Sequence, residues 1–190
     1  MELICLRNFL LFILFSFSTT LVAKESWIIE PAKSSITFTA TQNDAPVSGE
    51  FKTFTGTIDF DPNDLPSSNI HIIVDMASVA SDAAKVADYL KMEEWFNVSL
   101  FPKADFQSKS IKKIGDITYE AEGTLMIRDK TVPVTLTFNL DKFSPALAYV
   151  TGKTTIKRKD FGVGQGEWGQ TDLIKDNVEV NFIITAHEIK

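Results

Sequence analysis

The sequence predicts an all-β protein in which about eight antiparallel strands close into a barrel, interrupted by one short helical excursion. Apolar and polar residues alternate with a period of two over most of the chain after residue 24. The polar positions are rich in threonine, which is typical of half-buried antiparallel strands. Closing so many strands into a barrel removes the sheet edges that would otherwise pair with other chains.

The alternation marks the strands in order along the chain, at 36–41, 54–60, 70–74, 119–127, 132–140, 148–156 and 178–186. Several strands are expected to reach about ten to twelve residues, longer than a typical strand. Phe51 and Phe54 are three residues apart, so the inward phase slips and a bulge is expected between them. The dipeptides at 115–116 and 129–130 predict tight hairpin turns.

One stretch in the middle of the chain breaks this rhythm. Ser81 is expected to cap a helix that begins at Asp82, because Val86 and Leu90 fall at helical spacing. The dipeptide at 101–102 ends with proline and closes the stretch. The expected order is therefore four strands, a helical excursion, and then four or five strands.

Small residues recur on the inward-reading face of these strands, at Ala40, Gly56, Ala121, Gly123, Ala148, Gly152 and Ala186. Small side chains at so many positions would leave space inside the barrel, which favours a cavity with apolar walls. Alternatively, the glycines only relieve crowding at bends in a packed barrel. The pattern alone leaves both interpretations open.

Residues 1–23 have the pattern of a secretory signal peptide. A polar start containing Arg7 precedes an apolar run at 9–17, and small residues lead up to Ala23. The alternative is an uncleaved N-terminal anchor. We expect cleavage after Ala23, one domain at residues 24–190, and a periplasmic or secreted location. Cys5 is the one cysteine of the chain, so no disulfide or thiol chemistry is expected in that domain.

Composition and motifs exclude several function classes. The formal net charge is -6 and no basic cluster stands out, which argues against nucleic-acid binding. His71 and His187 lack metal-ligand spacing, so no metal site is expected, and without a Gly-x-Ser-x-Gly elbow we expect no catalytic residues. Residues 164–169 match GxGxxG, but no βαβ unit surrounds them. We interpret this segment as a turn or a point of close backbone approach.

A series of short motifs resembles the YceI-like family and covers essentially all of the chain after the predicted signal peptide. In order, the motifs are WIIEP at 27–31, SSITF at 34–38, GEF at 49–51, FTGTI at 54–58, FDP at 60–62, ASV at 77–79, WF at 95–96, FPKADF at 101–106, GTLMIR at 123–128, PVTL at 133–136 and RKDFG at 158–162, continuing as VGQGEW to 168. Each motif is weak alone, and their number and order make the set specific.

The resemblance implies an extended, lipocalin-like barrel in the bacterial periplasm or a secreted location. It also implies a long-chain lipid as ligand, a polyisoprenoid or isoprenoid quinone, and a homodimer. The resemblance implies no enzymatic activity and no cofactor besides the bound lipid. We therefore expect the chain to sequester or transport such a lipid, because each methylene buried in an apolar cavity contributes about 0.8 kcal/mol.

The expected site residues fall into three groups. The apolar walls are expected to be Phe38, Phe54, Ile58, Val74, Phe106, Leu125, Leu136, Phe138, Val150, Ile156 and Phe182. The barrel ends are expected to carry Trp95, Phe101, Phe161 and Trp168. Arg158 and Asp160 are candidates to contact a polar headgroup, and the alternative for both is a structural ion pair or turn.

Two other functions remain open at this point. One is an enzyme at the barrel mouth, which His71 or His187 beside a carboxylate or serine in a cleft would favour. The other is an accessory protein that holds or hands over a quinone-like lipid for a membrane redox partner. An exposed apolar patch beside the barrel mouth would favour that second function.

Overall fold

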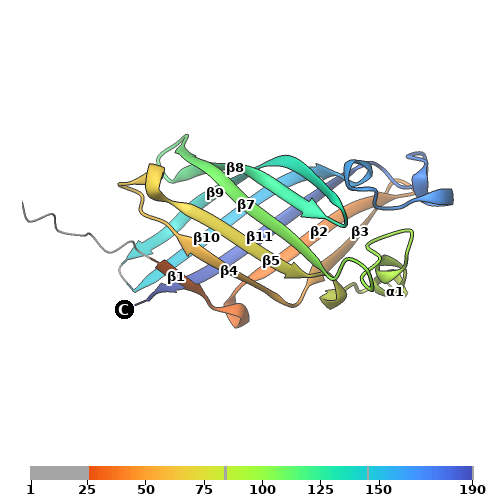
Figure 1. The fold of residues 1–190 in the computed structure, drawn as a ribbon, viewed down its shortest axis with the longest axis horizontal. Coiled ribbons are helices and arrows are strands. Elements are labelled where there is room, and N and C mark those ends of the chain that lie inside the picture. The colour runs from red at the N-terminus through yellow and green to blue at the C-terminus, as the bar shows by residue number, and fades with distance from the viewer. Residues whose placement is uncertain (1–25, 84, 145, 190) are drawn as a thin grey trace, which may run out of the picture.

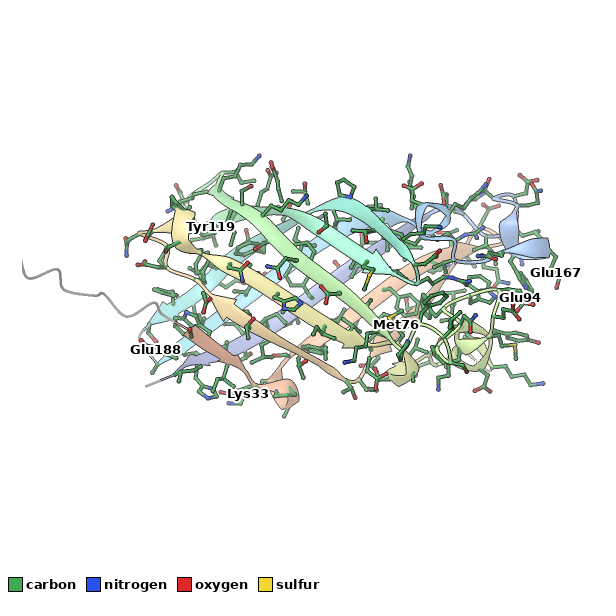
Figure 2. All side chains as sticks on the ribbon, viewed as in Figure 1. Lys33, Met76, Glu94, Tyr119, Glu167 and Glu188 are labelled. Carbon is green, nitrogen blue, oxygen red and sulfur yellow. The ribbon has the colours of Figure 1, made fainter. Side chains whose placement is uncertain are left out.

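The computed structural model describes residues 26–83, 85–144 and 146–189, and the predicted signal peptide at 1–23 lies outside them. Figure 1 shows an elongated barrel of tilted strands, with α1 near one end and β1 near the other. The strands are β1 (Ser26–Ile29), β2 (Ser35–Gln42), β3 (Ala45–Phe51), β4 (Phe54–Asp59), β5 (Asn69–Asp75), β6 (Val79–Ala80), β7 (Lys103–Lys113), β8 (Thr118–Ile127), β9 (Lys130–Ser144), β10 (Leu147–Lys157) and β11 (Asn177–Glu188), and the helix is α1 (Val86–Lys91).

The strands form one closed antiparallel barrel. Around the ring the order is β1, β4, β5, β7, β8, β9, β10 and β11, and β11 pairs back with β1. Beyond these, β2 pairs with β11 and β3, and β3 pairs with β6. In this way β2 prolongs β1, β3 prolongs β4, and β6 prolongs β5. Eight long strands surround the interior, which confirms the predicted eight-stranded lipocalin-like barrel.

Three of these long strands are each interrupted once. A 3-10 helix at Pro31–Lys33 separates β1 from β2, and another at Met76–Ser78 separates β5 from β6. Residues 52–53 separate β3 from β4, where a bulge was expected. The first half of the chain therefore supplies three long strands in six segments, not the four that were expected. Five strands follow α1, as expected.

The turns and the helix differ from the prediction in detail. The β7–β8 hairpin turns at the expected place, with the Ile114 amide donating to the Thr118 carbonyl at 2.9 Å. The next turn lies one residue early, with Arg128 at φ 56. The prediction that Ser81 caps a helix from Asp82 is wrong, because the Ser81 hydroxyl donates to the Ser48 carbonyl of β3 at 2.7 Å and the helix begins only at Val86.

Phenylalanine rings cover two of the glycines on the inner face of the barrel. A Cβ at Gly152 would lie 2.2 Å from the ring of Phe182, its partner on β11. A Cβ at Gly123 would lie 2.9 Å from the ring of Phe106 on β7. These glycines make room for neighbouring rings, so at these positions the second interpretation, relief of crowding, holds.

Helices contribute little to this fold. In the part of the chain that the structure describes, no helix has the length and apolar character needed to cross a membrane. The six-residue α1 lies with the loop that follows it at one end of the barrel (Figure 1). Its buried Leu90 packs with Phe38 and Val79. The helix therefore closes that end of the barrel over the interior.

Candidate functional site

The barrel interior holds two apolar chambers. The first, here called the narrow chamber, has a volume of about 170 Å³ and extends toward β1. Asp105 and Thr154 are the polar residues among those that line it. The other lining residues are Trp27, Ile36, Ile58, Phe60, Ile70, Ile72, Val74, Ala104, Phe106, Leu125, Leu136, Phe138, Leu140, Ala148, Val150, Val180, Phe182, Ile184 and Ala186.

The second, here called the wide chamber, has a volume of about 440 Å³ and lies beneath α1. Aromatic side chains of the helical segment and of the loop at 158–169 form part of its wall. Its lining residues are Ile36, Phe38, Ala40, Gln42, Val47, Phe51, Val74, Met76, Val86, Tyr89, Leu90, Trp95, Phe96, Ala104, Leu125, Ile127, Ile156, Arg158, Phe161, Val163, Trp168, Ile174, Val178 and Val180. This volume falls in the range typical of small-molecule sites.

The two chambers adjoin inside the barrel and share part of their walls. Both are lined by Ile36, Val74, Ala104, Leu125 and Val180. Inward apolar side chains also keep part of their surface exposed, as Leu136, Val150 and Phe182 do, although they lie inside a closed barrel. Side chains that face a void rather than a neighbour stay accessible in this way. The two chambers together therefore form a long, unfilled apolar channel, the first of the two interpretations of the small-residue pattern. Three of the small residues, Ala40, Ala148 and Ala186, line it.

Most of the predicted wall residues lie on this channel. Ten of the eleven line one or both chambers: Phe38, Ile58, Val74, Phe106, Leu125, Leu136, Phe138, Val150, Ile156 and Phe182. Phe54 is the exception, since it is buried in the packed core with Trp27 and lines neither chamber. That these side chains contact a ligand stays a prediction.

The aromatic residues predicted for the barrel ends divide in two. Trp95, Phe161 and Trp168 line the wide chamber, and the rings of Trp95 and Trp168 lie 5.9 Å apart. Phe101 lines neither chamber, and its ring lies 5.4 Å beneath the guanidinium of Arg128. Phe101 therefore supports the loop at this end without forming part of the wall.

Arg158 lies at the wall of the wide chamber, but its side chain is committed to the protein. The side chain is buried, with 3% exposed, and donates hydrogen bonds to five carbonyls, those of Val163, Gly164, Gln170, Ile174 and Lys175, at 2.9–3.2 Å. A guanidinium has five N–H donors, and all five are used. Arg158 therefore holds the surrounding loop, which was the alternative to a headgroup contact, and its donors are not free for a headgroup.

Gly164 explains part of the glycine-rich motif. A Cβ there would lie 2.4 Å from the guanidinium of Arg158, and Gly164 has φ 76. Only glycine allows this close approach at a positive φ. The motif is therefore a point of close backbone approach, one of the two interpretations of the sequence. The buried guanidinium that it surrounds has a lowered pKa, because burial disfavours its charge, while the charge of Asp176 opposes that shift.

Asp160 lies outside both chambers. Its side chain is exposed and lines a third hollow of about 500 Å³ between β9 and β10. The two headgroup candidates are thus separated: Arg158 belongs to the wall of the wide chamber and Asp160 to this outer hollow. Thr154 lines both the outer hollow and the narrow chamber.

Both histidines pair with carboxylates, and Asp105, the partner of His71, is itself among the residues that line the narrow chamber. His71 Nε2 lies 3.0 Å from Asp105 Oδ2, and His187 Nδ1 lies 3.6 Å from Glu30 Oε1. His71 alternates along β5 with Ile70 and Ile72, which line the narrow chamber, so its side chain points outward. Neither histidine lines a hollow described above. This arrangement does not favour an enzyme at the barrel mouth.

Sequence reasoning missed several wall residues of the wide chamber. Met76 is buried in the 3-10 helix between β5 and β6, and Val163 and Ile174 lie in the loop around Arg158. These residues follow no strand or helix period, because their backbone is irregular. The alternate glycines at 164 and 166 were visible, but nothing in them indicated that Val163 points inward.

The comparisons with known proteins agree with this geometry. Residues 27–186 match the YceI-like domain. The chain belongs to the YceI-like family. It is 32% identical to Protein YceI of Salmonella arizonae over 147 residues, which cover 75% of this chain and 73% of that relative.

Two solved structures share the barrel. BcnA of Burkholderia cenocepacia has a TM-score of 0.79 and 29% identity, over 83% of this chain and 98% of BcnA. A polyisoprenoid binding domain from Saccharophagus degradans, implicated in plant cell wall breakdown, has a TM-score of 0.69 and 14% identity, over 86% of this chain and 98% of that domain. At 14% identity the second likeness shows the fold alone.

Proposed function

We propose that this YceI-like protein binds a long-chain isoprenoid lipid in its barrel and thereby sequesters or transports it through the periplasm or outside the cell. The observation that carries this proposal is the apolar channel formed by the adjoining narrow and wide chambers. The polyisoprenoid-binding domain with the same fold supports the choice of ligand class. The predicted signal peptide supports the location.

The shape of the channel suits a linear tail. The narrow chamber adjoins the wide one and is lined by Trp27 of β1, whereas the wide chamber lies beneath α1. A flexible chain that occupies both would run from α1 toward β1, which lie near opposite ends of the barrel (Figure 1). Each methylene removed from water contributes about 0.8 kcal/mol, before the costs of ordering the chain. A rigid, bulky apolar molecule would use the wide chamber and leave the narrow one empty.

Carriage rather than catalysis is the role we propose, with no cofactor besides the lipid. Exposed apolar side chains at the α1 end, among them Tyr89, Met92 and Leu100, favour delivery to a membrane or protein surface. This observation supports the accessory role for a membrane redox partner as a second candidate function. A homodimer also stays a proposal.

Intrinsic fluorescence gives a direct test, because all three tryptophans line the channel: Trp27 the narrow chamber, Trp95 and Trp168 the wide one. Titration with a prenyl quinone should quench this fluorescence and saturate at one lipid per chain. The same quinone ring without its tail serves as the control and should bind far more weakly. Equal affinities for the two compounds would contradict a channel that holds a tail.

A further inference from the structure

The barrel wall has a gap between β9 and β10. The β9–β10 ladder runs from the pair Leu147–Ser144 to the pair Lys153–Thr137, and within the described residues it ends there. Both strands continue beyond that point with their other neighbours: β9 stays paired with β8 down to Lys130, and β10 stays paired with β11 up to Lys157. The two strands therefore diverge in the middle of the wall.

One residue of the sequence opposes pairing in this part of β9. Pro133 lies in the unpaired part of β9 and has no N–H to donate to a neighbouring strand. Thr154 on β10 spans the gap through its side chain, whose hydroxyl donates to the Thr135 carbonyl at 2.9 Å. At the far end, Phe161 lines the gap and is 1% exposed. The gap is thus a window in the wall, closed by the ladder on one side and by Phe161 on the other.

This window leads toward both chambers. The hollow in it, of about 500 Å³, shares Thr154 with the narrow chamber and shares Ile156 and Phe161 with the wide chamber. The alternation of β10 turns Thr154 and Ile156 inward and Lys153, Thr155 and Lys157 outward. A molecule in the window would touch apolar residues on its inner side and polar residues on its outer side.

The outer side of the window suits an uncharged, hydrogen-bonding group. Its charged residues balance, with Lys153 and Lys157 against Asp160 and Glu179. Threonines at 135, 137, 154 and 155 add hydroxyls that both donate and accept hydrogen bonds. A diphosphate would meet two carboxylates as well as two ammonium groups, whereas a quinone carbonyl or an alcohol needs only the hydroxyl and ammonium donors.

We infer that the β9–β10 window is the subsite for the lipid's polar headgroup and the route by which the tail enters the channel, and that the headgroup it takes is uncharged. The inference rests on the proposed function and adds the place and chemistry of the headgroup. Asp160, a headgroup candidate from the sequence, lies at this window. Arg158 holds the neighbouring loop and does not contact the headgroup.

Thiol protection tests the inference. In a Cys5→Ser background the substitution Thr155→Cys places a unique thiol at the window, on an exposed side chain of β10. The matched control is Thr57→Cys, an exposed threonine on β4 across the ring. Each variant is labelled with fluorescein maleimide before and after loading with geranylgeraniol, and loading is measured separately by tryptophan fluorescence.

At lipid concentrations about ten times Kd, roughly one tenth of the sites stay empty, so labelling at position 155 should slow about tenfold while position 57 is unaffected. Labelling Thr155→Cys first should block loading. Unchanged labelling of loaded Thr155→Cys would overturn the window subsite while leaving the channel intact. Absence of loading in the unlabelled parent chain would instead overturn the proposed function.

A second comparison tests the headgroup chemistry. Geranylgeraniol and geranylgeranyl diphosphate carry the same tail and differ only in the headgroup. The balanced window predicts that the alcohol binds at least as tightly as the diphosphate. A diphosphate that binds about tenfold more tightly, or more, would overturn the uncharged headgroup, since that ratio requires about 1.4 kcal/mol of extra attraction.

Discussion

Blocking the narrow chamber should shorten the tail that the protein accepts. Ala148 on β10 lines this chamber opposite Ala186 of β11. The substitution Ala148→Phe places a ring in the narrow chamber, which both strands line. Tails that reach past the wide chamber would then lose their distal contacts, whereas shorter tails would keep theirs.

The size of the effect follows from the chamber volume. At about 30 Å³ for each group of water size, roughly five or six methylenes fill the narrow chamber of about 170 Å³. Their burial contributes about 4 kcal/mol at about 0.8 kcal/mol each, and that corresponds to about a thousandfold in Kd. Ordering costs make this an upper bound.

The assay compares farnesol and solanesol, a short and a long prenyl alcohol delivered from the same detergent. Ala148→Phe should weaken solanesol binding by up to about a thousandfold and farnesol binding by less than about tenfold. Thr57→Phe places the same ring on the outer face and is the control. Both variants must keep a cooperative thermal transition, because overpacking can cost about 1–3 kcal/mol. The reasoning is refuted if a folded Ala148→Phe loses both alcohols by the same factor, or neither.

Three further predictions concern the frame around the channel. Arg158→Met removes the donor to five carbonyls and should lower the free energy of unfolding, measured by denaturant melts, by more than about 3 kcal/mol. Arg158→Lys has three donors and no planar fork, so it should not restore that stability. A variant as stable as the parent would contradict this role. Gly123→Ala puts a Cβ 2.4 Å from the Gln107 carbonyl and should destabilise the fold by about 1–3 kcal/mol. Gly115→Ala, whose nearest contact is 3.3 Å, should change thermal stability little. Equal melting temperatures for the two variants would argue against crowding at Gly123. The hydrogen bond from Lys112 lowers the pKa of Glu122, so this pair stabilises the fold above the ordinary glutamate pKa of about 4.3, and the stabilisation is lost as pH falls through the lowered pKa. Glu122→Gln should therefore lower the melting temperature slightly at pH 7 in low salt and not at pH 2. A lower melting temperature that persists at pH 2 would refute this role of the ion pair.

The fold could be predicted from the sequence where the chain is regular. Period-two alternation runs through most of the long strands, so the barrel and most of its inner face follow from a single rule. The exception is β7, where the alternation marked no strand and the register shifts between Ser108 and Ser110. The interruption between Phe51 and Phe54 was visible because it shifts that alternation by one residue, although it separates β3 from β4 and is not a bulge within one strand. Ser81 misled the helix prediction, because its hydroxyl serves a contact with β3 that is distant in sequence.

The site could be predicted only in part, for the same reason. Wall residues on strands, such as Leu136 and Phe182, follow the alternation and were identified. Phe54 has the same pattern but packs into the core, since the pattern marks the inward face and not the void. The window depends on where β9 and β10 part, and Pro133 was the one local signal of that.

Native mass spectrometry of the protein purified from its own host tests the central claim most directly. The channel predicts a stoichiometric adduct of one lipid per chain, which extracts under denaturing conditions as a prenyl lipid. A clean unliganded mass that stays unchanged after prenyl quinones are offered would contradict lipid carriage in the barrel.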